Sequence, residues 1–444
     1  MFSKNNTFFT TPAFVIGILF LNLRPLIDKL FVTQYFSSSE VVLMGTVSLL
    51  TFVPECIVLS TSYAIQSLTS RFSEKPYKFC YLFAGCITTI IVMIPLLTLL
   101  SLYPTFFLHL ISEKTPTDPA SLTFFRLSLI GCFFQCLIFC LRGFYSAYRN
   151  NRIFFSVIVI TLALHSLFNK VFLSGLGLFS PWGIQGMGLS YCLATMFGFA
   201  IYAEQLLNDA RLLNPTLPSF SQYSQLLKRA VPLAIHGIVD HIGTTFIFTC
   251  TSSYFGLIPL ASLHLVSSMQ GISPGAGFGL TALTEVTKTH VISSSLSRKT
   301  GEKILIAGCF ILGVTGLTIS LAAKPILALI SPYDLQLQSS TLSLMQITFS
   351  GLFLHVGCQI MLKILQAVDK TIPAISINLG FIYCFRIPLL FSLGSISNAS
   401  VETVGFILIS EKLIKLIAMI AYWQFTLSQH APSKIQMPPL IKSI

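Results

Sequence analysis

This sequence carries little charge and very few acidic residues. Only 9% of its 444 residues are charged, with 15 Asp and Glu against 27 Lys and Arg. Soluble globular chains carry roughly 25% charged residues, so this chain lacks the polar surface that a water-soluble core of its size needs. Hydrophobic residues make up 54% of the chain, and apolar runs recur along its whole length. These figures exclude a disordered, collagen-like or secreted soluble protein and indicate a membrane protein.

Motifs that carry chemistry are also missing. The eleven cysteines include no CxxC pair, and Cys132, Cys136 and Cys140 share one helix face, as small packing residues do. The sequence has no HExxH, DDxxD or Walker A motif, and its His and Asp residues show no compact metal-ligand spacing. We therefore expect no enzyme, no metal site and no cofactor beyond a coupling ion, and an ATP-driven pump is disfavoured.

The apolar runs predict twelve transmembrane helices. Each is long enough to cross about 30 Å of hydrocarbon at 1.5 Å per residue, and runs of this length cross as helices rather than as barrel strands. The predicted spans are 10–36, 41–70, 79–103, 120–146, 153–176, 183–207, 230–254, 259–289, 304–330, 338–366, 372–394 and 402–427. The first run carries Asn22, Arg24 and Asp28 and lacks a signal-peptidase pattern, so we interpret it as a retained helix.

The basic residues predict the orientation. Eighteen of the 27 Lys and Arg residues fall in or beside the connections on the side of the N-terminus. Because Lys and Arg concentrate on the cytoplasmic side, both termini are predicted to be cytoplasmic, in a multi-pass protein of the inner membrane. The charge is spread over several loops and a tail rather than gathered on one face, so nucleic-acid binding is not expected.

The middle of the chain predicts a division into two halves. The segment 208–229 is polar, contains Pro215 and Pro218, and is predicted to be a cytoplasmic linker. The predicted regions are an N-lobe at 1–207 with six helices, the linker, a C-lobe at 230–427 with six helices, and a cytoplasmic tail at 428–444.

Two internal offsets suggest that the halves are duplicates. Asp28 and Asp240 lie 212 positions apart, and the similar junctions around Ala147 and Ala367 lie 220 positions apart. Halves with an even number of spans have the same orientation, so a pseudo-two-fold axis along the membrane normal is predicted.

Ionisable residues within the predicted spans are candidates for function, because burying a charge in lipid is costly. Asp28 lies one helical turn after Arg24. The pair either neutralises itself within the helix or presents a carboxylate to a cavity, where it binds a proton or a cation.

Polar side chains at four-residue spacing mark further spans. His236, Asp240 and Thr244 form such a stripe, which cannot face lipid and either joins helices or binds a cation. His165 and Asn169 form a second stripe. Three further candidates for the lining of a polar interior are Glu55, His355 and Gln359.

Several stretches together resemble one family. They are LRPLIDKLFVTQYFSSSEVVLMGTVSLL from Leu23, LRGFYSAYRNNRIFF from Leu141, the run from Ile160 to Thr195, VPLAIHGIVDHIG from Val231 and LKILQAVDKTIPA from Leu362. In order and spacing they resemble the multidrug and toxic compound extrusion (MATE) transporters, which belong to the multidrug/oligosaccharidyl-lipid/polysaccharide exporter superfamily. The resemblance covers residues 12–427.

The resemblance implies a V-shaped pair of six-helix bundles that exchanges organic cations for H⁺ or Na⁺. It implies that Asp28 is the ion or proton site of the N-lobe, that Asn169 belongs to the same site, and that Asp240 is the acidic position of the C-lobe. Three positions depart from the pattern. His165 stands where the family often has Asn, Tyr191 stands at a Thr position with Thr195 one turn on, and His355 lies closest to an absent acid. Because His titrates near neutral pH, these departures favour proton coupling.

The sequence therefore predicts a monomeric antiporter that works by alternating access in the lipid bilayer. Its ion-coupling residues are predicted to be Asp28, His165, Asn169 and Asp240. Its predicted cavity residues are Arg24, Glu55, Thr195, His236, Thr244, His355 and Gln359. The expected substrate is a small amphipathic organic cation. One alternative is a flippase for a lipid-linked sugar precursor, which would use intramembrane cations such as Arg24 and Arg386. Another is a polytopic membrane transferase, for which clustered acids are missing.

Overall fold

The computed structural model describes residues 23–69, 75–147, 151–175, 180–213, 217–271, 294–367, 370–395 and 399–429. Over these residues the chain forms helices joined by short connections, and it contains no strand. Helices satisfy all their backbone hydrogen bonds internally, which is what a segment crossing hydrocarbon requires. The predicted all-α class is confirmed.

The first half consists of six long helices and one short one. A helix covers residues 23–35. It is followed by α2 (Ser38–Thr69), α3 (Lys75–Leu102), the short α4 (Pro104–Ile111), α5 (Pro119–Ala147), α6 (Asn151–Ser174) and α7 (Ile184–Leu213). The sequence analysis did not predict α4 as a separate helix. Pro104 explains the break from α3, because proline fits the first turn of a helix but interrupts a helix interior.

The second half repeats this order with more breaks. Its helices are α8 (Phe220–Phe255), α9 (Leu257–Gln270), α11 (Ser294–Leu321), the short α12 (Ala323–Ile330), α13 (Leu335–Ser350), α14 (Leu352–Ala367), α15 (Thr371–Phe381), α16 (Ile387–Ser392) and α17 (Val401–Gln429). A π-helical turn, η1 (Ile382–Arg386), joins α15 to α16, and a 3₁₀ turn, η2 (Leu393–Ser395), follows α16.

The described helices lie where the twelve spans are predicted, but the count of twelve is not established. Eight helices are long and apolar enough to cross a membrane, or nine if α13 and α14, which meet at 47°, are one span. Residues 10–22 of the first predicted span and 272–289 of the eighth lie outside the described residues. The last span, α17, carries Glu411, Lys412 and Lys415 in its middle and is not among the eight.

The predicted linker is helical over most of its length. The preceding helix α7 continues to Leu213, and α8 begins at Phe220, ten residues before the predicted start at 230. A capping box stabilises this start, because the Ser219 side chain accepts from the backbone of Gln222 while the Gln222 side chain accepts from the Ser219 N–H. Pro232 therefore lies inside α8 and does not open it.

The two halves repeat each other in structure as well as in order. Short helices α4 and α12 occupy equivalent places, and each precedes a helix capped by an aspartate. Asp118 accepts from the backbone N–H groups of Ala120 and Ser121, and Asp334 accepts from that of Leu337. These shared details agree with the duplication that the offsets suggested.

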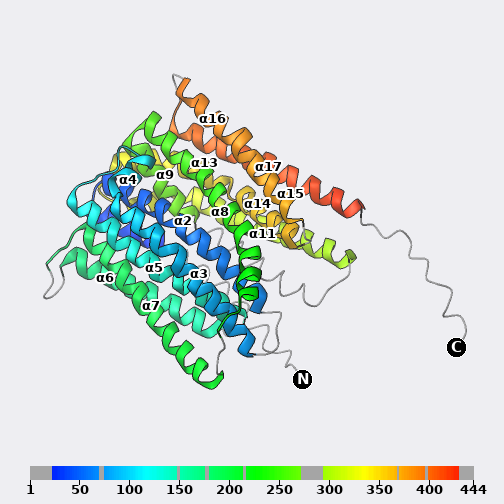
Figure 1. The fold of residues 1–444 in the computed structure, drawn as a ribbon. Helices are drawn as coiled ribbons and strands as arrows, with labels where there is room; N and C mark the ends of the chain where they lie inside the picture. Colours follow the sequence, from blue (N-terminus) through cyan, green and yellow to red (C-terminus); the bar gives the residue numbers. More distant parts are fainter. Residues whose placement is uncertain are drawn as a thin grey trace, which may run out of the picture.

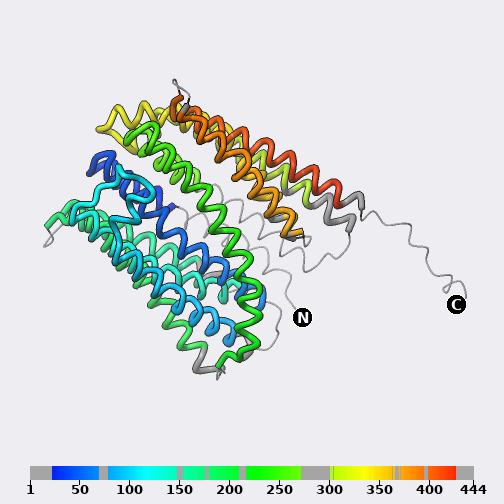
Figure 2. The backbone as a smooth tube through the Cα atoms, turned by 45° about the horizontal axis from the view of Figure 1, so that its top comes forward, coloured from blue at the N-terminus to red at the C-terminus, as the bar shows by residue number. Residues whose placement is uncertain are grey.

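The helices form two bundles that touch at one end (Figure 1). Figure 2 shows the bundles diverging from that end, which holds α4 and α9, towards the last turns of α7 and α17. Hydrogen bonds join the bundles at the closed end: Ser38 Oγ donates to Asp334 Oδ2 at 2.7 Å, and the hydroxyls of Ser112 and Ser252 lie 2.7 Å apart. We call the bundles the N-lobe and the C-lobe. Although α8 belongs to the second half, it packs along α2 of the first.

Candidate functional site

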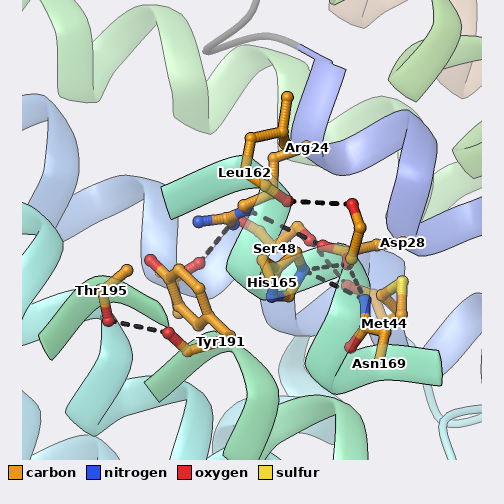
Figure 3. A network of polar contacts seen from close by, with 11 residues as sticks. Arg24, Asp28, Met44, Ser48, Leu162, His165, Asn169, Tyr191 and Thr195 are labelled. Carbon is orange, nitrogen blue, oxygen red and sulfur yellow. Dashed lines mark hydrogen bonds and ion pairs between the residues drawn. The ribbon is translucent and has the colours of Figure 1, made fainter. Parts of the chain in front are cut away.

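The N-lobe contains a polar network centred on Asp28, where the first helix meets α6 (Figure 3). Asp28 Oδ1 lies 2.5 Å from His165 Nε2 and 3.2 Å from Asn169 Nδ2. His165 and Asn169 are one helical turn apart on α6 and are buried. The three residues that the sequence analysis proposed for ion coupling in this lobe therefore lie together.

The contact between Asp28 and His165 holds a proton. Two acceptor atoms 2.5 Å apart would repel each other, so either His165 Nε2 donates to the carboxylate or a protonated carboxyl donates to the imidazole. Asn169 Nδ2 also lies 3.3 Å from Nε2 and can donate to it only when that nitrogen is an acceptor. The network can therefore rearrange its hydrogen bonds when the proton moves.

Arg24 completes the network on the other side of Asp28. Its Nε lies 3.7 Å from Asp28 Oδ2, and its guanidinium carbon lies 4.0 Å from the centroid of the Tyr191 ring. The expected pair within the first helix is thus present, and a cation–π contact accompanies it. Gly131 on α5 makes room for the ring, since a Cβ at this position would lie 2.6 Å from Tyr191.

The network leaves several buried polar atoms without a hydrogen bond. Among the described residues these include Arg24 Nε, His165 Nδ1, Asn169 Oδ1 and Tyr191 OH. Arg24, Asp28 and Tyr191 also line a cavity of about 30 Å³, together with Ser48 and Thr51. A cavity of this size and polarity has room for water. Water in this cavity can therefore satisfy such atoms.

Two further carboxylates lie near Cys56, on helices that pack against each other. Glu55 lies on α2 of the N-lobe and Asp240 on α8, and both are close enough to Cys56 to act on it electrostatically. The two helices are in close contact here, because a Cβ on Gly237 would lie 3.5 Å from Cys56 Sγ. Both acids are partly buried, so the structure brings together carboxylates that lie far apart in the sequence.

Asp240 has a partner that repeats the arrangement at Asp28. Its Oδ1 accepts from Asn378 Nδ2 at 2.8 Å, and His236 Nε2 lies 3.4 Å from the same amide nitrogen. Each half of the chain therefore pairs one aspartate with one asparagine. The asparagine is Asn169 on α6 in the first half and Asn378 on α15 in the second. The sequence analysis missed Asn378, although its spacing from Asp240 is close to the spacing between Asp28 and Asn169.

Other predicted cavity residues are placed differently. The hydroxyls of Thr195 and Thr244 donate to carbonyls of their own helices, at Tyr191 and Asp240. Gln359 is half-buried on α14, one turn after His355. His355 lies within electrostatic range of Arg386, Lys412 and Lys415. Three cations, rather than an acid, are therefore the charged groups that act on His355.

The described part of the chain contains no group of three or more His, Cys, Asp or Glu residues arranged to hold a metal ion.

Comparison with solved structures identifies the fold. An inward-facing multidrug-resistance MATE transporter matches with a TM-score of 0.75 and 13% identity, over 92% of this chain and 95% of that one. A mutant of a Vibrio cholerae MATE transporter matches at 0.70 with 15% identity, over 96% and 97% of the two chains. A transporter of the same superfamily from Pyrococcus furiosus, described as having a binding pocket of reverse polarity, matches at 0.63 with 12% identity over 94% and 95%.

Comparison of the sequence with protein-family models and with curated proteins gives no match. The structural matches cover nearly the whole chain, and the hydropathy of the helices agrees with them. The chain is a multi-pass membrane protein with the fold of the MATE transporters, as the sequence resemblance predicted.

Proposed function

We propose that this protein is a secondary antiporter that exports amphipathic organic cations in exchange for protons. The observation that carries the proposal is the network of Asp28, His165 and Asn169, in which a carboxylate and an imidazole hold one proton between them. A proton fits this network better than Na⁺ does, because hard cations prefer oxygen ligands and one neighbour of the carboxylate is an imidazole nitrogen.

Protonation of Asp28 would change the packing of the N-lobe. A charged Asp28 attracts Arg24, which also lies over Tyr191, whereas a neutral Asp28 releases that attraction. The first helix and α6 then have a different preferred arrangement in each protonation state. Exchange requires that the proton bind more tightly to one conformation and the substrate more tightly to the other.

Glu55 and Asp240 are the proposed acceptors of the substrate cation. They lie near Cys56 on two helices that pack together, α2 of the first half and α8 of the second, so a cation between them would contact both halves of the chain. Among the described residues, no hydrogen bond or ion pair engages the Glu55 carboxylate. A partly buried carboxylate without such a partner gains free energy from an organic cation.

The first test is transport in proteoliposomes that contain the purified protein and a fluorescent lipophilic cation. A pH gradient is expected to drive transport by the wild type, and Asp28→Asn is expected to abolish it. Glu113→Gln removes an exposed acid between α4 and α5 and serves as the matched control. Transport that follows a Na⁺ gradient instead would contradict proton coupling, and no transport under either gradient would overturn cation export.

A second candidate is a flippase for a lipid-linked sugar precursor. It is favoured by Arg386 and Lys415, two cations buried within the C-lobe, and by the reversed pocket polarity described for the Pyrococcus furiosus neighbour. Reorientation of a fluorescent lipid-linked sugar phosphate, without gradient-driven cation transport, would favour this candidate over export.

A further inference from the structure

The C-lobe holds a buried charged cluster that proton coupling at Asp28 does not use. Arg386 and Lys415 are each 6% exposed, and Glu411 is fully buried. Glu411 Oε2 accepts from Arg386 Nε at 2.6 Å, and Glu411 Oε1 accepts from Lys415 Nζ at 2.9 Å. Each oxygen of the single carboxylate is therefore already engaged by one cation.

The cluster has more positive than negative charge. Lys412 lies next to Glu411 on α17, within electrostatic range of both Arg386 and Lys415. The next carboxylate is Asp240, reached through Asn378, which accepts from Lys415 at 2.9 Å and donates to Asp240 at 2.8 Å. Among the described residues, three cations thus surround two carboxylates, and one positive charge remains without an anion.

The cluster also has unused hydrogen-bond donors. Arg386 has five N–H groups, and only its Nε donates to a described residue. The half-buried ammonium of Lys412 donates to no described residue. In the N-lobe, by contrast, the buried Lys29 donates to the carbonyl of Val41 at 2.7 Å. These donor atoms are not fully enclosed by the protein, so an anion from outside the chain can reach them and supply the missing hydrogen bonds.

The backbone brings Arg386 to this place. Arg386 closes the π-helical turn η1, and such turns often occur at functional sites. The turn packs against α8 at Gly243, where a Cβ would lie 2.2 Å from the Ile382 side chain. The guanidinium reaches Glu411 through its Nε, and its remaining donors form the planar fork that matches a carboxylate or a phosphate.

We propose that Arg386, Lys412 and Lys415 bind an acidic group of the transported molecule, a carboxylate or a phosphate. This inference rests on the proposed transport function and narrows its substrate to zwitterionic amphiphiles. The cationic group lies at Glu55 and Asp240, and the acidic group lies on the far side of Asn378. The acidic group of the substrate would supply the negative charge that Arg386, Lys412 and Lys415 lack.

The test uses two dyes that share one cationic chromophore, rhodamine B with a free carboxylate and its ethyl ester without one. Binding to the purified protein in lipid nanodiscs is measured by fluorescence polarisation, with empty nanodiscs subtracted. The wild type is expected to bind the acid about tenfold more tightly than the ester, as one charge-assisted hydrogen bond provides. Arg386→Gln and Lys412→Gln are expected to remove this preference.

The controls separate loss of the site from loss of the fold. Lys412→Arg keeps the charge and should keep the preference, and Lys170→Gln removes an exposed cation of α6 and should not change it. Because the Lys412 ammonium has no hydrogen bond to a described residue, Lys412→Gln keeps the test decisive if Arg386→Gln does not fold.

A second arm identifies the source of the acidic group. Dihexanoyl phosphatidic acid and dihexanoyl phosphatidylcholine compete with the dye, and stronger competition by the phosphatidic acid, lost in Lys412→Gln, would assign a lipid phosphate. Equal binding of acid and ester together with equal competition by the two lipids overturns the proposal. Gradient-driven transport is measured separately on the wild type and on Lys412→Gln, so failed proton coupling and a failed acid site are distinguishable.

Discussion

At the scale of single residues, small side chains decide how closely the polar groups approach. Tyr191 lies over Arg24 because Gly131 on the neighbouring helix leaves room for its ring. The ring in turn holds the guanidinium beside Asp28. A change at a glycine that carries no chemistry can therefore reach the proposed proton site through one aromatic ring.

We expect Gly131→Ala to displace Tyr191 and to weaken proton-driven transport. The added methyl group would lie 2.6 Å from the ring, and overpacking of this kind costs about 1–3 kcal/mol. The expected result is a lower melting temperature in detergent together with slower transport. Gly380→Ala is the matched control, because a Cβ there meets nothing within 4 Å, and alanine is the better helix former. Unchanged melting and transport in Gly131→Ala would contradict the role of the ring.

At the scale of elements, the two aspartate caps allow the duplicated halves to be compared. Asp118 caps α5 and makes no contact with the other lobe in the described structure, whereas Asp334 caps α13 and also accepts from Ser38 of the N-lobe. Loss of an aspartate cap costs about 0.5–2 kcal/mol. We expect Asp334→Ala to destabilise the protein more than Asp118→Ala does. The difference in unfolding free energy should equal the contribution of the hydrogen bond from Ser38 to Asp334.

Thermal unfolding of both variants, repeated in a Ser38→Ala background, measures this difference. The larger loss of stability in Asp334→Ala should disappear when Ser38 cannot donate its hydrogen bond. A difference that persists in the Ser38→Ala background would show that another contact of Asp334 causes it.

Acid should weaken the Asp118 cap. Hydrogen bonds, first from the Ser121 hydroxyl, lower the pKa of Asp118. Its contribution is therefore present above the unfolded carboxyl pKa and is lost as the pH falls through the lower folded value.

At the scale of the whole molecule, hydrogen bonds join the two lobes at one end. The lobes are joined at the end that holds α4 and α9 and diverge towards the other end (Figure 2). If the protein works by alternating access, these contacts must break during each cycle.

We expect a disulfide across the closed end to stop transport. The hydroxyls of Ser112 and Ser252 lie 2.7 Å apart, so the double variant Ser112→Cys/Ser252→Cys should form a disulfide on oxidation. Transport in proteoliposomes should fall to the background level and return after reduction. The single variants are controls for the eleven native cysteines. Full transport by the cross-linked protein would show that this end does not open.

The sequence by itself determined the membrane location and the helical class, and it predicted the two halves and most of the candidate acids. These properties depend on composition, hydrophobic run length and spacing along a single helix, which are local. The pairing of Arg24 with Asp28 and that of Glu411 with Lys415 were predictable for the same reason, because residues four apart on a helix are neighbours.

Only the tertiary structure decided which polar groups meet. Asp28 contacts His165 at a separation of 137 residues, and Asp240 contacts Asn378 at a separation of 138. No periodicity within one helix reports which faces of two distant helices pack together, so Asn378 and the cluster around Glu411 could not be assigned. The start of α8 and the separate α4 also depended on capping and on a proline break, which hydropathy does not register.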